Sequence, residues 1–549
     1  MKSKKLIMYG ICASLIMSSL MGCAQGKNAT LASETITTVV DLTDKTVEAV
    51  ETDDTLSETK MFSDRDKETG YDEINSVVIT LSDKATQVDS NAVQVSGNTI
   101  TIKDEGTYIL RGDLGNGQII VDAEKTDKLQ LVLDGIQINN SSSAPIYIKQ
   151  ADKVFITLAN DSSNTLSTEG EFIAIDDNDI DAVIYSKDDL TLNGEGSLVI
   201  STQYGKGIVS KDDLIITGGN YDITTSDHGL VGKDSIRIAD GVFDIKALED
   251  GINSKADLLI AGGTFQISAG DDGIHADLNL TISGGIIDIL ESEEGIEGET
   301  IDITGGYITL VALDDGINAA NSSDITTSND KNANVISANT PYIKISGGVI
   351  HINAQGDGVD SNGNIYITGG ETYVSGPTQS GDSALDFDGT AEITGGIFVA
   401  VGSSGMLQNF GNGSSQGSIL VTIPAMQNDP IILKDSAGKE LITFTPEKQY
   451  SSVLISTPDI LKDETYTITM GQESQAITME NIIYSPAGGM GGGRPGKMGG
   501  FKDNDGKTGN PPMGERPEFE NGERPELPNG ERPEPPNGER ARAPQEEEK

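Results

Sequence analysis

Apolar and polar residues alternate over short stretches of the chain, and the alternation recurs at a nearly constant interval. Gly-Gly or Asp-Gly pairs begin at positions 218, 240, 262, 284, 305, 347, 369 and 395, so most steps are about 22 residues. The residue two places before each pair is always an isoleucine: Ile216, Ile238, Ile260, Ile282, Ile303, Ile345, Ile367 and Ile393. Alternation with a period of two predicts short β-strands that bury one face and are joined at a glycine bend.

Regular spacing of this kind is typical of a solenoid, in which each repeat forms one coil. Equivalent side chains then stack about 4.8 Å apart along an aliphatic core. We predict an all-β protein whose body is a right-handed parallel β-helix with about 22 residues per coil and disordered termini. The longer step between the pairs at 305 and 347 predicts one coil with a polar insertion, Ala319 to Thr340.

The composition on either side of the repeat divides the chain into six segments. A Gly-Glu-Arg-Pro-Glu repeat near the C-terminus cannot bury a core, and a Thr, Ser, Asp and Glu-rich stretch follows the apolar N-terminal run. A separate β domain is the less favoured alternative for the region after the repeat. The segments are a signal peptide (1–22), a disordered linker (23–73), irregular first coils with a cap (74–205), regular coils (206–406), a C-terminal β cap (407–485) and a disordered tail (486–549).

The N-terminus predicts a lipid anchor. A short basic start and an apolar run precede Leu20-Met21-Gly22-Cys23, which resembles the lipobox of bacterial lipoprotein signal peptides. The resemblance implies cleavage before Cys23, a lipid on its thiol, and attachment to the outer face of the bacterial membrane. The chain has 2 cysteines, so the mature protein would have no disulfide. We expect an extracellular, membrane-anchored protein that meets the membrane through its lipid alone.

Acidic residues recur at the turn that opens most coils, where the sequence reads Asp-Asp-Gly-Ile or a close variant. Equivalent carboxylates about 4.8 Å apart repel by roughly 3 to 4 kcal/mol per pair at an effective dielectric of about 20. Several Ca²⁺ ions would relieve this repulsion, because calcium favours flexible sites with many oxygen ligands. Solvent-facing acidic turns without a metal are the alternative. The candidate metal ligands are Glu249, Asp250, Asn253, Asp271, Asp272, His275, Glu293, Glu294, Glu297, Asp314, Asp315, Asn318, Asp357, Asp360 and Asp382.

These features together resemble a known family over about residues 75–485. Gly-Gly strands, Asp-Gly-Ile turns, a lipoprotein signal and a Gly, Met and Pro-rich tail are similar to the clostridial carbohydrate-binding β-helix family, whose founding member is a cellulose- and acidic-sugar-binding surface protein. The resemblance implies a pectate-lyase-like fold, several calcium ions at the acidic turns, and affinity for cellulose or polygalacturonate. It carries over no sugar-contact residue.

Three functions fit the sequence, and we favour a calcium-dependent, non-catalytic carbohydrate-binding protein. Calcium would bridge protein carboxylates to the carboxylates of an acidic polysaccharide such as polygalacturonate. A structural or adhesive surface rod is the first alternative. A polysaccharide lyase is the second, since such enzymes pair calcium with a basic side chain. The candidate bases are scattered singly, so we assign no catalytic residue: Lys206, Lys211, Lys233, Arg237 and Lys255.

Charge and aromatic content limit the partners. The net charge of −48 argues against nucleic-acid binding. The chain has no tryptophan, so stacking on sugars would depend on tyrosines. We expect a monomer whose partner is a polysaccharide. The candidate rings are Tyr185, Tyr204, Tyr307, Tyr342, Tyr366 and Tyr373, whereas Tyr221 belongs to the apolar repeat.

Overall fold

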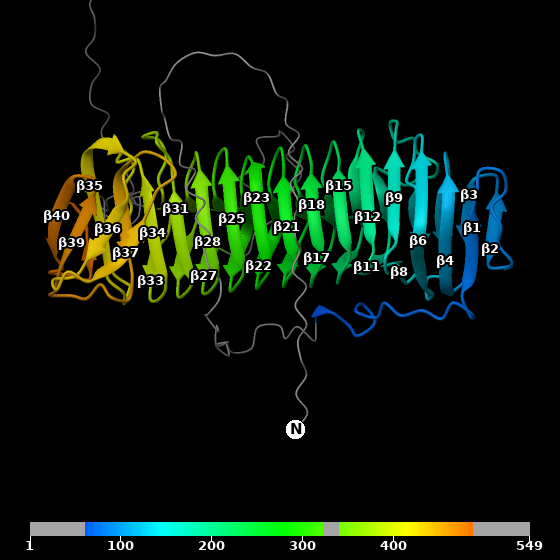
Figure 1. Ribbon diagram of the computed structural model, residues 1–549, viewed down its shortest axis with the longest axis horizontal. Helices are drawn as coiled ribbons and strands as arrows, with labels where there is room; N and C mark the ends of the chain where they lie inside the picture. Colours follow the sequence, from blue (N-terminus) through cyan, green and yellow to red (C-terminus); the bar gives the residue numbers. More distant parts are fainter. Residues whose placement is uncertain (1–60, 322–339, 487–549) are drawn as a thin grey trace, which may run out of the picture. The chain divides into compact units, whose positions relative to one another are not determined.

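The computed structural model describes residues 61–321 and 340–486, and the regular elements of these residues are strands, β1 to β41 (Figure 1). The predicted signal peptide, the lipidated Cys23, most of the predicted linker, residues 322–339 of the predicted insertion and residues 487–549 lie outside the described residues. Among the residues described, no helix is long and apolar enough to cross a membrane.

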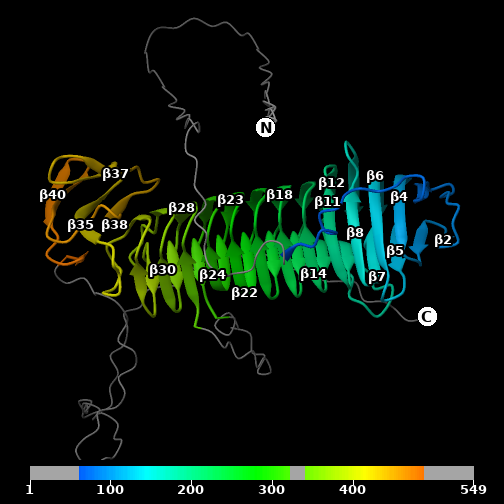
Figure 2. The same ribbon diagram turned by 90° about the horizontal axis from the view of Figure 1, so that it is seen from below.

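Each regular coil contributes one strand to each of three parallel stacks (Figures 1 and 2). Ile236 pairs with Leu214 of the preceding coil and with Leu258 of the following one, so equivalent residues are about 22 positions apart. The first stack follows the acidic turns, the second stack precedes the glycine bends, and the third stack follows these bends. The prediction of an all-β parallel solenoid is confirmed.

The first stack carries the outer residues that matter most below. Its strands are β3 (Thr99–Ile102), β5 (Gln118–Asp122), β7 (Ile146–Gln150), β10 (Ala182–Ser186), β13 (Lys206–Ser210), β16 (Leu230–Gly232), β19 (Ile252–Ser254), the starts of β22 (Ile274–Ile282) and β24 (Ile296–Ile303), β26 (Ile317–Ala319), β29 (Val359–Ser361) and β32 (Asp386–Phe387). A hairpin partner of β3, the antiparallel β2 (Val93–Ser96), lies beside the first strands.

The second and third stacks complete the coils. The second contains β1 (Val77–Leu81), β4 (Gly106–Leu114), the start of β6 (Lys128–Asn140), β8 (Lys153–Leu158), β11 (Asp189–Gly194), β14 (Asp213–Ile216), β17 (Ser235–Ile238), β20 (Asp257–Ile260), the ends of β22 and β24, β27 (Tyr342–Ile345), β30 (Asn364–Ile367) and β33 (Ala391–Ile393). The third contains the end of β6, β9 (Ser163–Thr168), β12 (Ser197–Thr202), β15 (Asn220–Thr224), β18 (Val242–Lys246), β21 (Thr264–Ser268), β23 (Ile286–Ser292), β25 (Tyr307–Ala312), β28 (Val349–Ala354), β31 (Glu371–Ser375) and β34 (Ile397–Gly402).

The interior is a continuous apolar core. All eight isoleucines that precede the glycine bends are 0% exposed. Tyr221, Phe243 and Phe265 stack inside consecutive coils with ring centroids 5.1 and 4.6 Å apart, as the apolar repeat predicts for Tyr221. Full burial of one such side chain contributes about 1.5–3 kcal/mol. The coils are therefore held together mainly by vertical contact between identical positions.

A small β cap follows the last coil. Strand β38 (Tyr450–Ser456) pairs antiparallel with β34, so the cap continues the solenoid directly. An apolar cluster fills the space between this part and a second sheet. The other cap strands are β35 (Ser418–Gln427), β36 (Ile431–Lys434), β37 (Glu440–Phe444), β39 (Thr465–Met470), β40 (Glu473–Thr478) and β41 (Ile483–Tyr484).

Residues 61–73 form an N-terminal strap that runs back over the outer face of the second stack (Figure 1). Phe62 is 3% exposed and packs with Ile215 and Leu259. The carbonyl oxygen of Asp66 accepts hydrogen bonds from Asn193 and Thr217, at 3.0 and 2.7 Å. The prediction of a disordered linker is therefore wrong for the strap, because isolated residues in this polar stretch find partners on the solenoid.

The strap is fixed by a buried ion pair. The Asp66 carboxylate lies 2.8 Å from the Lys153 ammonium and accepts hydrogen bonds from Ser63 and Thr191, both at 2.7 Å. Burial raises the pKa of Asp66, but the bonds to Lys153, Ser63 and Thr191 outweigh burial and lower it below its usual value. The ionised form of Asp66 therefore stabilises the docked strap.

The second glycine of each bend is required by the backbone. Gly263 has a φ of +102°, and a Cβ there would lie 3.1 Å from the carbonyl oxygen of Gly241 in the preceding coil. We expect Gly263→Ala to lower the free energy of unfolding by about 2 kcal/mol, because of backbone strain and this close approach. Chemical unfolding measures the loss. Gly381→Ala, at a site with open space, should change stability by less than about 0.5 kcal/mol.

Acid should release the strap. A carboxyl whose folded pKa is depressed stabilises the fold above its unfolded pKa, and this contribution is lost as the pH falls through the folded pKa. We expect Asp66→Asn to weaken strap docking by about 3 kcal/mol at neutral pH, since Lys153 stays buried without its counter-ion. Hydrogen exchange of the strap amides measures the change. The difference between variant and parent should disappear at low pH, and a difference independent of pH would contradict this account.

Candidate metal centre

The acidic turns lie one above another between the third and first stacks, as the repeat predicts. The amides of Gly251, Gly273 and Gly295 donate to the carbonyl oxygens of Asp272, Glu294 and Asp315 in the next coil, at 2.9 to 3.0 Å. We call an acid directly before a turn glycine an inner acid, and an acid one position earlier in a turn an outer acid; Asp382 is an outer acid because Ser383, the next residue, occupies the inner position of its coil. The inner acids are Asp250, Asp272, Glu294, Asp315 and Asp357, and the outer acids are Glu249, Asp271, Glu293, Asp314 and Asp382.

Inner and outer acids differ in their surroundings. Asp250 and Asp272 are 3% and 5% exposed, whereas the outer acids Glu249 and Glu293 are exposed. The backbone fixes the inner side chains, because the amide of Asp272 donates to the Asp250 carboxylate at 3.1 Å. The sequence alone does not distinguish the two acids of a turn, but in the structure the inner acids are the ones that cluster with side chains of the first stack.

The residues three positions after the inner acids form a second row on the outer face of the first stack. Asn253, His275 and Glu297 occupy paired positions on β19, β22 and β24. Asn318 and Asp360 continue the row on β26 and β29. This row faces the inner acids, so the predicted combination of turn acids with residues three positions later is present in the structure.

Three clusters within these two rows bring ligand atoms within 4.8 Å of one another. Asp272 belongs to two of them, and each cluster spans consecutive coils. The clusters are Asp250, Asp272 and His275; Asp272, Glu294 and Glu297; and Asp315, Asp357 and Asp360.

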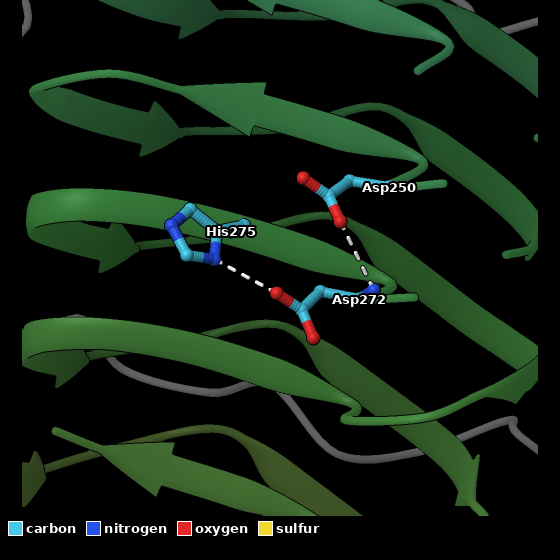
Figure 3. A group of neighbouring side chains, drawn as sticks. All are labelled: Asp250, Asp272 and His275. Atoms are coloured by element: carbon cyan, nitrogen blue, oxygen red, sulfur yellow. Dashed lines mark hydrogen bonds and ion pairs between the residues drawn. The ribbon is translucent and has the colours of Figure 1, made fainter. Parts of the chain in front are cut away.

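His275 belongs to the first cluster, where Figure 3 shows it beside Asp250 and Asp272, and it also contacts Glu297 of the second cluster. Its Nδ1 lies 2.8 Å from both Asp272 and Glu297, and its Nε2 lies 3.0 Å from Asp277. Burial lowers the pKa of His275, but these three carboxylates outweigh burial and raise it to about 12. In the protein without metal, the imidazolium therefore supplies positive charge inside the carboxylate row.

Five carboxyls of the three clusters hold protons more strongly than usual, whereas bonds to His228 and His275 outweigh burial and lower the pKa values of Asp250 and Glu297. Burial, with repulsion from neighbouring acids, raises the pKa of Asp272 to about 8 and that of Glu294 to about 9. The same causes raise the pKa of Asp315, Asp357 and Asp360 to about 6, 7 and 8. A cation that displaces these protons would relieve both the repulsion and the loss of solvation.

We call the row of inner acids and the second row together the inner rows. A groove of about 620 Å³ runs along part of them. Two amide oxygens in it, Asn253 Oδ1 and Asn318 Oδ1, are buried and have no hydrogen-bond partner among the described residues. Carboxylates and unpaired amide oxygens are the donors that hard divalent cations prefer, so these residues fit calcium. The groove is lined by His228, Asp250, Asn253, Lys255, Asp271, Asp272, His275, Asp277, Glu293, Glu294, Glu297, Asn318 and Ala320.

The predicted ligands therefore divide into two groups. The inner acids and the residues three positions later face one another, and Asp271 and Glu293 reach the groove from the outer row. The outer acids Glu249 and Asp314 do not line the groove and Asp382 joins none of the three clusters. Sequence reasoning missed Asp277, which lies two positions after His275 on β22 and therefore on the same side of the strand.

A lysine of the chain supplies a positive charge before the first inner acid, at one end of the row. The amide of Gly207 donates to the His228 carbonyl oxygen, so Lys206 and His228 occupy the inner position of the two coils before Asp250. The Lys206 ammonium lies 2.5 Å from Asp181 and 3.2 Å from Asp227. The Lys-Gly-Ile sequence at 206–208 matches the Asp-Gly-Ile turns. This match could have predicted that Lys206 takes the position of an inner acid.

The candidate bases and tyrosines are dispersed. Arg237 bonds to Asp213 and to the strap, and Lys211 lies over the ring of the buried Tyr185. Of the five candidate bases, Lys255 alone lines the groove, where it lies 3.5 Å from Asp277. The prediction that Tyr185 is available to a sugar is wrong, because the tyrosine packs under the outer face of the first stack.

Comparisons of the sequence with known proteins find relatives of this chain. Residues 96–330 match the sequence model of a family described as carbohydrate-binding domain-containing protein. A carbohydrate-binding domain-containing protein of Acetivibrio thermocellus is 40% identical over 151 residues, which are 27% of this chain and 52% of the relative, so the chain spans about half the relative's length. The chain is thus similar to a clostridial carbohydrate-binding family, and this predicted resemblance is confirmed.

A solved structure is also similar. It is described as the polysaccharide lyase-like protein from C. thermocellum, as a gadolinium derivative. The two sequences are 29% identical over 58% of this chain and 97% of that chain, with a TM-score of 0.30.

In protein freed of metal by EDTA, we expect the free energy of unfolding to fall as the pH rises from about 5 to about 9. The pKa values of Asp272, Glu294 and Asp360 are raised in the folded state, so the folded chain holds more protons than the unfolded chain in this interval. Chemical unfolding at a series of pH values measures the slope. Glu294→Gln should make it shallower, whereas Glu293→Gln, the exposed neighbour, should not, and equal slopes in both variants would contradict the assignment.

Proposed function

We propose that the chain is a calcium-dependent, non-catalytic carbohydrate-binding protein of the bacterial cell surface. Its ligand would be a plant cell-wall polysaccharide such as polygalacturonate or cellulose. The observation that carries the proposal is a groove lined by two carboxylate clusters, with a third cluster on the following coils, in a chain similar to carbohydrate-binding proteins. The groove passes over consecutive coils, which suits an extended polymer better than a single sugar.

The inner rows would hold the calcium ions. Asp272, Glu294 and Glu297 form one oxygen-rich cluster, and Asp315 with Asp357 and Asp360 forms another. Bound calcium would supply the positive charge that a uronate carboxylate requires in this acidic groove. Without it, an acidic polysaccharide would meet only like charge from the inner acids, so binding should depend on the ion.

The arrangement of basic side chains supports binding without catalysis. Abstraction of a proton beside a uronate carboxylate needs an unprotonated base within hydrogen-bond reach of the sugar. Lys206 is engaged by Asp181 and Asp227, and Lys255 is held near Asp277. Burial lowers the pKa of Lys206, but Asp181 and Asp227 outweigh burial and raise it above its usual value, so its ammonium stays protonated and cannot act as a base.

The location at the cell surface is proposed from the sequence. Cys23 would carry the lipid, and the polar residues that follow it would separate the body from the membrane. The strap begins the folded body at Met61, on the outer face of the second stack. The calcium-binding groove follows the first stack, so the tether would not enter the groove from this start.

Calcium binding should be strong enough to stabilise the fold. We expect calcium added to EDTA-treated protein, freed of residues 1–23 and the tail, to raise the melting temperature, because ligands that bind only the folded state add stability. Differential scanning calorimetry and isothermal titration measure the shift and the affinity. The double variant Glu294→Gln with Asp360→Asn should lose at least about tenfold in affinity at each altered cluster.

Exposed acids provide the matched control. Glu249→Gln with Asp314→Asn removes the same charge from outer acids that do not line the groove, and this variant should bind calcium as the parent does. The absence of any calcium-induced stabilisation would overturn the metal assignment.

Polysaccharide binding should follow the metal. We expect retention on insoluble polygalacturonate with calcium and loss of retention in EDTA, measured by pull-down. The Glu294→Gln and Asp360→Asn double variant should bind weakly, and the control double variant normally. Failure to bind with calcium present would favour a structural or adhesive surface rod, whereas release of unsaturated uronate products would favour a polysaccharide lyase.

A further inference from the structure

Exposed apolar side chains concentrate on the third stack and the turns that follow it, outside the lining of the acidic groove. Of the exposed large apolar side chains among the described residues, about half lie on β18, β23, β25 or the turns that follow them. Val242, Ile286 and Tyr307 are 50%, 54% and 47% exposed. The others in this group are Leu248, Leu290, Val311 and Leu313.

Strand pairing arranges these side chains in rows that follow the coils. Val242 pairs with Thr264, which pairs with Ile286, and Ile286 pairs with Tyr307. Val311 lies four residues after Tyr307, on the same outward side of β25. A largely apolar row from Val242 to Tyr307 therefore runs along one edge of the outer face of the third stack, which we call the third face. Val311 adds apolar surface at the opposite edge, where the paired position on β28 is Asn353.

Hydrogen-bonding side chains occupy the middle row of the third face. Asp244 pairs with Gln266, which pairs with Asp288, and Asp288 pairs with Thr309. His351 continues the row on β28. The Thr309 hydroxyl donates to Asp288 at 2.6 Å, and Lys246 contacts Asp244 at 2.8 Å, so each carboxylate keeps further acceptor sites.

The third face also has a trough and several aromatic rings. A trough of about 410 Å³ crosses β12, β15, β18 and β21, and Asp222, Asp244 and Gln266 line it. Further along, the His351 ring lies 5.9 Å from the Tyr307 ring and stacks on Tyr373 at 5.1 Å. The face thus combines flat apolar surface with acceptors spaced about 4.8 Å apart, one coil after another.

The middle row selects among possible occupants. A protein partner would bury Asp244 and Asp288 in its interface core, where charged residues are depleted and incompletely paired carboxylates are costly. An acidic polysaccharide would meet like charge from the same residues. A neutral sugar chain offers C–H surface to the apolar row and hydroxyl donors to the carboxylates of the middle row, so it satisfies both rows.

We propose that the third face is a second polysaccharide-binding site, independent of metal, that takes an extended neutral glycan chain along the rows of Val242, Asp244, Ile286, Asp288 and Tyr307. The inference rests on the proposed carbohydrate-binding function but uses none of the proposed calcium ligands. The two sites lie on different stacks of the same coils, so one molecule would bind acidic and neutral polymers by separate contacts.

Binding to cellulose in EDTA tests the third face. We expect the full chain without residues 1–23 to be retained on insoluble cellulose in EDTA, and Ile286→Thr with Tyr307→Thr to lower the association constant about tenfold or more. Threonine keeps strand propensity at these exposed positions, and an unchanged melting temperature would show that the fold is intact. Tyr204→Thr is the matched control, because Tyr204 is 48% exposed but lies in the turn after β12.

The two sites can fail separately. Retention on cellulose in EDTA should persist in the Glu294→Gln and Asp360→Asn double variant and be lost in the Ile286→Thr and Tyr307→Thr double variant. This result would support binding at the third face whatever the calcium experiments give. No retention on cellulose, equal retention by the parent and the double variant, or loss of self-association in the double variant as its only effect would overturn the proposal. The last outcome would make the third face a contact between copies of the chain.

Discussion

Vertical repetition of identical positions is the constraint on which this structure depends. In a parallel solenoid each residue lies above its counterpart in the coil below, so a favourable contact is repeated many times and an unfavourable one is repeated as often. Isoleucine above isoleucine forms the continuous core. Carboxylate above carboxylate forms the acidic rows, where the same geometry demands a positive charge or a proton at every step.

The chain meets this demand in three ways along one row. At its start, Lys206 places an ammonium between two carboxylates. In the next coils, His275 contacts three carboxylates at once. Further on, Asp315, Asp357 and Asp360 have no basic side chain in their cluster, and their pKa values are raised. The progressive loss of internal cations along one uniform backbone favours external cations for the later coils.

Much of the fold could be predicted from the sequence, because a solenoid converts spacing directly into contact. The isoleucine series gave the coil length and the core, and the Asp-Gly-Ile turns gave the stacked acids. The division into inner and outer acids depends on which way each side chain points from its turn, which the sequence does not state. The strap was missed for a different reason, since Phe62 and Asp66 find partners on coils more than a hundred residues away.

The third face illustrates a limit of periodicity as a guide to function. Alternation assigns Val242, Ile286 and Tyr307 to the solvent side, and a single exposed apolar residue in a strand needs no explanation. Their importance arises only when the register places them in one row beside Asp244 and Asp288. In a repeat protein, core positions are recognised by their regularity, whereas binding positions depart from the repeat. The departures become interpretable as a surface only once the coils are stacked.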